Sequence, residues 1–320
     1  MAQAGKARKT MNPFDEAPKP PQEPEPSAEN PAPEQELTPT PPSSPEMFSS
    51  VTTDQAPPPT PAPPAYPEDL TITWSWPHFI LFFFFGFASL VTIQGLMAAH
   101  YAPHKHLSST EMERFLLSNP KFTIGSMVIW YAALFFFLYI TLSVLRGHSF
   151  WECLGWRKIR TRPGENKRNP AVYFAWGCGL SFLVAVVSTQ MKTPENLPME
   201  ELFKHRQTAL LFMAMAVLVA PLVEETLFRG YLYPLFARSF GVLPGIVLTG
   251  VLFGLMHGAQ LGWTWSLVAV LIFVGIVFTT VRARTGSVFA SYLMHLGYNS
   301  LISFFAILGT HGFTKLPTNH

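Results

Sequence analysis

Two adjacent glutamates lie in an otherwise apolar stretch, LVAPLVEETLFRGYLYPLF, which begins at Leu218. Glu224 and Glu225 are followed by Arg229, and the spacing of four residues places Glu225 and Arg229 on one face of a helix. A charged side chain near the middle of a bilayer costs about 2.5–3.5 kcal/mol on insertion scales. Three charged side chains in such a stretch therefore need partners or a chemical role.

Histidines occur in two further apolar segments. His257 ends FGLMH, and HLGYN contains His295 and Asn299, which share a helix face at a spacing of four. Glutamate and histidine inside a membrane can activate water, relay protons or bind a metal. The sequence has no aspartate after residue 70 and no HExxH motif, which excludes an intramembrane aspartyl protease and a zincin helix.

The elements that must position these residues are apolar runs of about 20 residues, the length that crosses a bilayer core of roughly 30 Å. With 48% hydrophobic and 13% charged residues, against about 25% charged in soluble domains, the composition indicates a membrane protein. We therefore predict an all-α, polytopic membrane helix bundle. Its spans are predicted at residues 77–99, 122–145, 170–190, 207–238, 241–258, 264–282 and 287–309.

The first 70 residues differ from the rest of the chain. They hold 19 of the 30 prolines and 11 Asp and Glu against 4 Lys and Arg. Such a segment cannot bury enough apolar surface to fold, so we predict a disordered acidic tail at 1–70 and a transmembrane domain at 71–320. The tail either stays solvated or binds a cytoplasmic partner through its Pro-rich stretches.

Basic residues predict the orientation of the bundle. The connection after the second span, RGHSFWECLGWRKIRTRPGENKRN, carries seven Lys and Arg and should lie in the cytoplasm, together with the N-terminus, Arg238, Arg282 and Arg284. Counted from that side at about 1.5 Å per residue, Glu224 lies roughly 21 Å deep, His257 roughly 24 Å and His295 roughly 12 Å. Helix tilt would let these side chains meet in one polar pocket.

At this point the motifs resemble a known family. EETLFRG is similar to an EExxxR motif, FGLMH to FxxxH and HLGYN to HxxxN of the CAAX protease and bacteriocin-processing family, also called the abortive infection family. ECLGWRK resembles the lead-in common before its core, so the resemblance covers about 150–310, with a catalytic core at about 170–310. It implies an intramembrane endopeptidase and allows an eighth transmembrane helix.

Hydrolysis of a peptide bond needs an activated water, a proton donor for the leaving amine and donors for the oxyanion. We assign Glu224 as the base that takes the proton of water, with His257 holding that water or sharing the proton. His295 and Asn299 would polarise the carbonyl and stabilise the oxyanion, and Glu225 would pair with Arg229. A divalent metal such as zinc on Glu224, His257 and His295 is an equal alternative.

Other readings remain open at this level. A non-catalytic membrane scaffold or immunity protein of the same family could keep these motifs, and intramembrane Glu and His could serve a proton-coupled transporter. A rhomboid-like serine site is not favoured, because Ser181 in GCGLSFL lacks the following glycine. We expect a multi-pass protein of a bacterial inner membrane that acts on a membrane-anchored protein or peptide and not on nucleic acid. The substrate could be CAAX-like, a leader or a C-terminal sorting tail.

Overall fold

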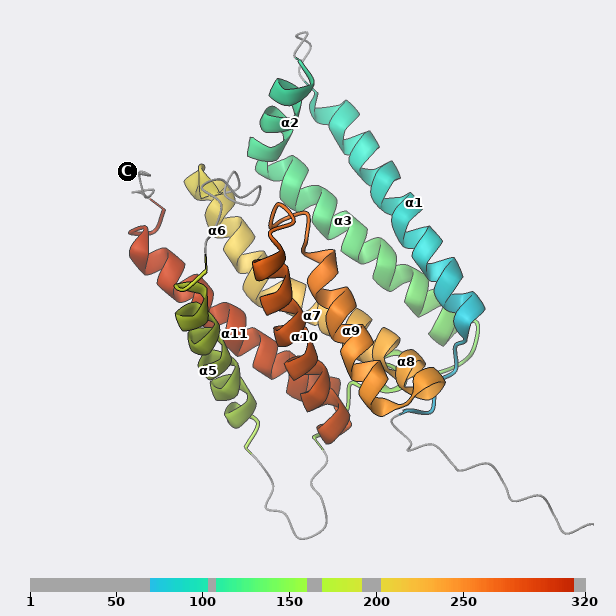
Figure 1. The fold of residues 1–320 in the computed structure, drawn as a ribbon. Helices are drawn as coiled ribbons and strands as arrows, with labels where there is room; N and C mark the ends of the chain where they lie inside the picture. The colour runs from blue at the N-terminus through green and yellow to red at the C-terminus, as the bar shows by residue number, and fades with distance from the viewer. Residues whose placement is uncertain (1–69, 103–107, 160–168, 192–202, 314–320) are drawn as a thin grey trace, which may run out of the picture. The chain divides into compact units, whose positions relative to one another are not determined.

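The computed structural model describes residues 70–102, 108–159, 169–191 and 203–313, and within these ranges the chain forms helices and no strand. The predicted disordered tail lies outside the described residues, apart from Leu70. The helices, labelled as in Figure 1, are α1 (Trp76–Tyr101), α2 (Ser109–Ser118), α3 (Pro120–Leu138), η2 (Tyr139–Val144), α4 (Phe150–Cys153), α5 (Ala171–Ser188), α6 (Arg206–Ala214), η4 (Met215–Val219), α7 (Ala220–Glu224), η5 (Glu225–Leu232), α8 (Tyr233–Phe240), α9 (Val242–Met256), α10 (Trp265–Thr285) and α11 (Val288–Gly309).

Six helical stretches of the described residues are long and apolar enough to cross a bilayer, which confirms an all-α, multi-pass bundle. They are Trp76–Tyr101, Pro120–Val144, Ala171–Ser188, Arg206–Phe240, Trp265–Thr285 and Val288–Gly309. The remaining segment of the seven expected from the sequence is α9, which has only 15 residues and a length of about 22 Å. Apart from these six stretches and the shorter α9, the described residues contain no apolar helix that could be the eighth span allowed by the family resemblance.

The span from Arg206 to Phe240 is not a regular α-helix. Pro221 has no N–H to donate, and the turn before it widens into the π-helical segment η4, where the N–H of Ala220 bonds the carbonyl of Met215. A second π-helical segment, η5, begins at Glu225 and carries Glu225 and Arg229, directly after Glu224 at the end of α7. Such segments often occur at functional sites, because they change the direction in which neighbouring side chains point.

Glycines bring the helices around this span into close contact. A Cβ on Gly250 or Gly254 of α9 would lie 2.7 Å from a backbone nitrogen of α10, so this GxxxG pair lets the two helices pack closely. A Cβ on Gly177 of α5 would lie 1.9 Å from the Met294 carbonyl oxygen of α11. These two contacts hold α9 against α10 and α5 against α11, as Figure 1 shows.

The basic connections lie together at one end of the bundle. Arg238 donates to the carbonyl of Ile72, Arg146 donates to the carbonyl of Thr73, and the N–H of Val288 donates to the carbonyl of Gly155 at 2.9 Å. We call this the basic end; it carries Arg146, Arg157, Lys158, Arg238, Arg282 and Arg284. The opposite end, called the far end, holds the last turns of α1, α5, α9 and α11 and the first turns of α3, α6 and α10 (Figure 1).

Candidate active site

Glu225 and Arg229 form a fully buried ion pair on η5. The Nη1 of Arg229 donates to Oε1 of Glu225 at 2.9 Å, and both side chains have 0% exposure. Arg229 also donates to the Thr279 hydroxyl at 3.2 Å and to the Gly275 carbonyl at 2.9 Å on α10. Its guanidinium lies 4.5 Å from the centre of the Phe253 ring on α9. The pairing expected from the sequence is present, and it ties η5 to α9 and α10.

His295 connects this ion pair to the second glutamate. Its Nδ1 lies 3.0 Å from Oε1 of Glu225, so the carboxylate accepts the Nδ1 hydrogen and sets the orientation of the ring. Its Nε2 lies 3.8 Å from Oε2 of Glu224. The ring packs 4.7 Å from Phe278 of α10, and the side chain is 4% exposed. Glu225 therefore has a second contact that the sequence spacing did not indicate.

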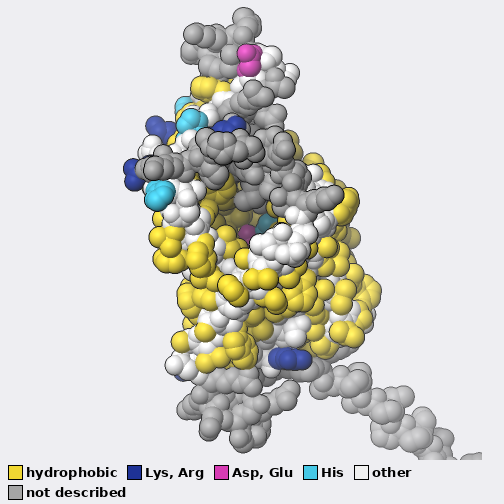
Figure 2. All heavy atoms as spheres, turned by 60° about the vertical axis from the view of Figure 1, so that its left-hand side comes forward, with side chains coloured by type: hydrophobic (Ala, Val, Ile, Leu, Met, Phe, Trp, Pro, Cys, Tyr) yellow, Lys and Arg dark blue, Asp and Glu magenta, His cyan; other side chains and the backbone are white. Residues whose placement is uncertain are grey.

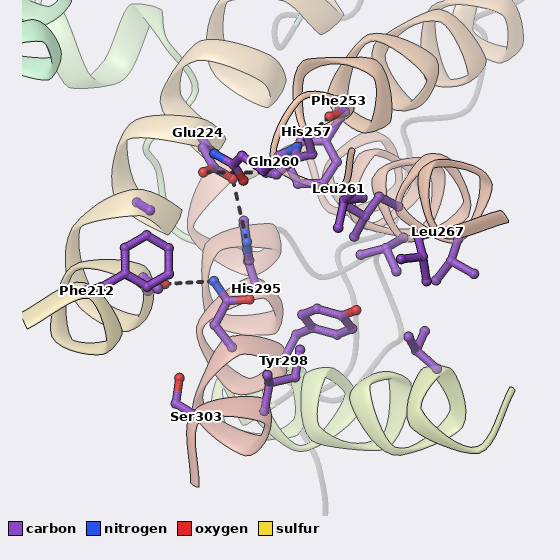
Figure 3. Close-up of a pocket in the computed structure, with 18 of the residues that line it drawn as sticks. Phe212, Glu224, Phe253, His257, Gln260, Leu261, Leu267, His295, Tyr298 and Ser303 are labelled. Atoms are coloured by element: carbon purple, nitrogen blue, oxygen red, sulfur yellow. Dashed lines mark hydrogen bonds and ion pairs between the residues drawn. The ribbon is translucent and has the colours of Figure 1, made fainter. Parts of the chain in front are cut away.

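Glu224 faces away from the ion pair. Its carboxylate is 17% exposed, and Oε1 lies 4.0 Å from Nε2 of His257, which ends α9. The Nδ1 of His257 is held by the Phe253 carbonyl at 2.7 Å, which leaves Nε2 directed at Glu224. Figure 3 shows Glu224, His257 and His295 converging from three different helices. The tilt of α11 thus brings together residues for which counting along the helices gave different depths.

Asn299 lies one turn beyond His295 and contacts the irregular span. Its Nδ2 donates to the Ala216 carbonyl at 2.7 Å. In the π-helical register of η4 the donor to this carbonyl would be residue 221, which is a proline. The Asn299 amide therefore replaces a helical hydrogen bond that Pro221 cannot make. Its carboxamide nitrogen carries a second hydrogen, and the residue also lines the cavity described next.

A cavity of about 330 Å³ contains the three converging side chains. Figure 2 shows a hollow on this face, with acidic and histidine side chains inside a mainly hydrophobic surround. The polar residues that line it are Tyr131, Ser188, Glu224, His257, Gln260, His295, Tyr298, Asn299 and Ser303, and the other fifteen are apolar. The site is thus a small polar patch within an apolar pocket inside the bundle.

Sequence reasoning missed two groups of residues at this site. Thr279 and Gly275 hold Arg229, and nothing in their local sequence marks them as partners of a buried arginine. Tyr131 and Gln260 line the cavity, and Figure 3 shows Gln260 extending into it near Glu224 and His257. Gln260 follows His257 by three residues in a glycine-containing loop, and this position could have indicated that it lies near the site. Ser181 is buried on α5 and is not among the lining residues.

A metal site was the alternative use of Glu224, His257 and His295. Structural and catalytic zinc sites need three or more protein ligands that converge on one point. Among the residues that the structure describes, no group of three or more His, Cys, Asp or Glu side chains is arranged to hold a metal ion. We therefore derive no step through a metal and describe what the side chains themselves do.

Comparison with known proteins gives one match. No curated protein and no solved structure matches the chain. Residues 206–301 match the sequence profile described as type II CAAX prenyl endopeptidase Rce1-like, and this range runs from α6 into α11 and includes the residues of all three motifs. The part of the membrane bundle that holds the cavity is therefore similar to the Rce1-like type II CAAX prenyl endopeptidases, a protease family.

Proposed function

We propose that this protein is an intramembrane endopeptidase that hydrolyses a peptide bond of a membrane-associated protein in the cavity around Glu224. The observation that carries the proposal is the convergence of the Glu224 carboxylate with Nε2 of His257 and of His295, at 4.0 and 3.8 Å. These separations are too long for direct hydrogen bonds and suit a water molecule that bridges the groups. Glu224 takes a proton from that water, which attacks the substrate carbonyl.

The two histidines have different partners, and we infer different roles from them. The Nδ1 hydrogen of His257 goes to the Phe253 carbonyl, which directs Nε2 at the cavity, where we propose that it accepts a hydrogen bond from the water. In the proposed arrangement His295 carries hydrogens on both ring nitrogens, and the Glu225 carboxylate accepts the one on Nδ1. An Nε2–H of His295 then donates to the substrate carbonyl and to the oxyanion that forms from it.

Asn299 and the ion pair complete the proposed arrangement. One N–H of the Asn299 amide bonds the Ala216 carbonyl, and the second is available to the oxyanion. Glu225, Arg229 and their partners on α10 act as positioning groups that hold the ring of His295. Protonated Glu224 or the His257 ring returns the proton to the leaving amine.

The setting of this reaction is also part of the proposal. The apolar lining of the cavity favours a hydrophobic peptide segment, as in a CAAX-like tail, a leader or a C-terminal sorting tail. We place the protein in a cell inner membrane with the basic end and the N-terminus in the cytoplasm. The Pro-rich tail lies outside the described residues, and we propose that it either stays solvated or binds a cytoplasmic partner. Divalent metal is not part of the proposed reaction.

The test compares protein termini in cells that express either the full chain or Glu224→Gln at equal levels. Glutamine keeps the size and hydrogen bonding of the side chain and cannot act as a base. The matched control is Glu152→Gln, an exposed carboxylate at the basic end. We expect mass spectrometry of the membrane fraction to find a set of proteins that stay uncut with Glu224→Gln and are cut with the control. Identical termini in all three strains would contradict the protease proposal and favour a scaffold.

A further inference from the structure

The cavity around Glu224 extends toward only one end of the bundle. On α5, and on α10 except for Phe278, the lining residues belong to the half of the helix nearer the far end. On α3 and α11 the lining residues lie near the middle of the helix. None of the described lining residues belongs to α8, which lies at the basic end (Figure 1). The lining residues that lie closest to that end are Ser188, Phe203, Gln260, Leu261 and Ser303.

The end of α9 explains why the cavity reaches the far end. The helix is about 22 Å long and stops at Met256, well short of a bilayer core of roughly 30 Å. The chain from His257 to Thr264 continues as turns, and Gln260 and Leu261 of these turns line the cavity. Non-helical backbone at membrane depth is tolerated where protein buries it or where it lines a wet cavity. This loop therefore forms part of a water-accessible mouth.

Exposed tryptophans place this mouth near a membrane boundary. Trp263 lies in the loop and Trp265 is the first residue of α10, and their side chains are 51% and 66% exposed. Tryptophan is enriched at the level of the lipid headgroups. His257 lies six and eight residues before these tryptophans along the chain, so the site has a short path to the water on that side.

The charge of the connections assigns a side of the membrane to the mouth. In the sequence, the connections at the basic end hold ten Lys and Arg, seven of them between residues 146 and 168, and those at the far end hold seven. The side with the excess of Lys and Arg stays in the cytoplasm. The far end, with the mouth of the cavity, then faces away from the cytoplasm.

We propose that the active site receives its substrate from the non-cytoplasmic leaflet. This inference rests on the proposed peptidase function and names its substrate class: a membrane-anchored protein whose apolar segment enters the hollow of Figure 2 with the scissile bond in the non-cytoplasmic half of the bilayer. The apolar walls accept the segment, and the loop from His257 to Thr264 supplies water to the bond. Substrates whose cleavage sites are presented only on the cytoplasmic surface do not reach the site.

The test measures from which side of the membrane the cavity can be reached. Gln260→Cys is made in the full chain with Cys153→Ser and Cys178→Ser, and Ala259→Cys in the same loop serves as a second, milder variant. The matched control is Arg284→Cys, an exposed position at the basic end. A membrane-impermeant charged maleimide is added to intact spheroplasts and to inside-out vesicles. We expect the loop cysteines to react at least tenfold faster in spheroplasts and Arg284→Cys at least tenfold faster in inside-out vesicles.

Two results would overturn the inference. Labelling of both loop cysteines only from the cytoplasmic side would place the mouth on the other face, and lack of labelling from either side would show that the cavity is closed to water. Failure of the peptidase proposal is a separate result, because labelling does not depend on activity. If the cells with Glu224→Gln do accumulate uncut proteins, their cleavage sites should map to the non-cytoplasmic half of a membrane segment, and cytoplasmic sites would contradict the inference alone.

Discussion

Glu224 and Glu225 are adjacent in the chain, yet they lie in two different environments. Glu225 has 0% exposure, pairs with Arg229 and holds Nδ1 of His295, whereas Glu224 is 17% exposed and faces His257 and His295 across about 4 Å. We call Glu225 with its partners Arg229 and His295 the sealed face, and Glu224 with the cavity that it lines the cavity face. The difference teaches that residue type alone does not distinguish a structural carboxylate from a reactive one. The hydrogen-bond partners of each carboxylate and its access to water distinguish them.

The largest effect is expected on the cavity face. Glu224→Gln should lower peptidase activity by about 10²–10⁴-fold, the usual contribution of a positioned general base. The thermal unfolding midpoint of the purified protein should stay unchanged, because the described part of the chain gives the Glu224 carboxylate no hydrogen-bond partner whose loss would cost stability. Measuring activity and unfolding on the same preparation checks this. A large fall in unfolding temperature would mean that both glutamates are structural.

A substitution on the sealed face should mainly lower the stability of the protein. Arg229→Met leaves the Glu225 carboxylate buried without its partner and should lower the free energy of unfolding by about 3–5 kcal/mol. Arg284→Met, at an exposed arginine of the basic end, should change it by less than about 0.5 kcal/mol. Chemical denaturation in detergent gives both values. Equal small effects at the two arginines would show that the ion pair does not stabilise the bundle.

A double substitution sharpens the same comparison. Glu225→Leu combined with Arg229→Met removes both buried charges and should recover most of the stability lost with Arg229→Met alone. Activity should not recover, because Nδ1 of His295 has then lost its acceptor on Glu225. If activity returns together with stability, the contact between Glu225 and His295 has no role in catalysis.

Asn299 should give a smaller effect, on stability. Asn299→Ala leaves the Ala216 carbonyl without a donor and should cost about 1–3 kcal/mol. Pro221→Ala restores a backbone N–H at the position that this register needs, so the cost of Asn299→Ala should shrink in that background. A double-mutant cycle on unfolding free energies measures the coupling. Additive effects would contradict the proposed replacement of a helical hydrogen bond.

The smallest expected effect concerns metal on the cavity face. Because Glu224, His257 and His295 are not arranged as a metal site, 1,10-phenanthroline should leave peptidase activity within about twofold. A non-chelating phenanthroline isomer at the same concentration is the control. Loss of activity with the chelator alone, and its return with added zinc, would assign the cavity face to metal-assisted hydrolysis.

The sequence by itself determined the helical membrane class, six of the spans and the residues of the polar cluster. Apolar runs of spanning length permit little except helices in lipid, and charged residues within such runs stand out because their insertion is costly. Spacing of four residues also predicted the pair of Glu225 with Arg229. Such local rules act within one helix, so they can be applied without knowing its neighbours.

Only the tertiary structure decided which atoms meet. The contact of His295 with Glu225, the hold of Gly275 and Thr279 on Arg229, and the bond from Asn299 to Ala216 all join different helices. They depend on the tilt of α11, on close packing at glycines and on the wider turn before Pro221, none of which follows from periodicity along one helix. The cavity likewise extends toward the far end because α9 ends at Met256. Residues from several other helices line the space beyond it, and one helix read alone does not reveal them.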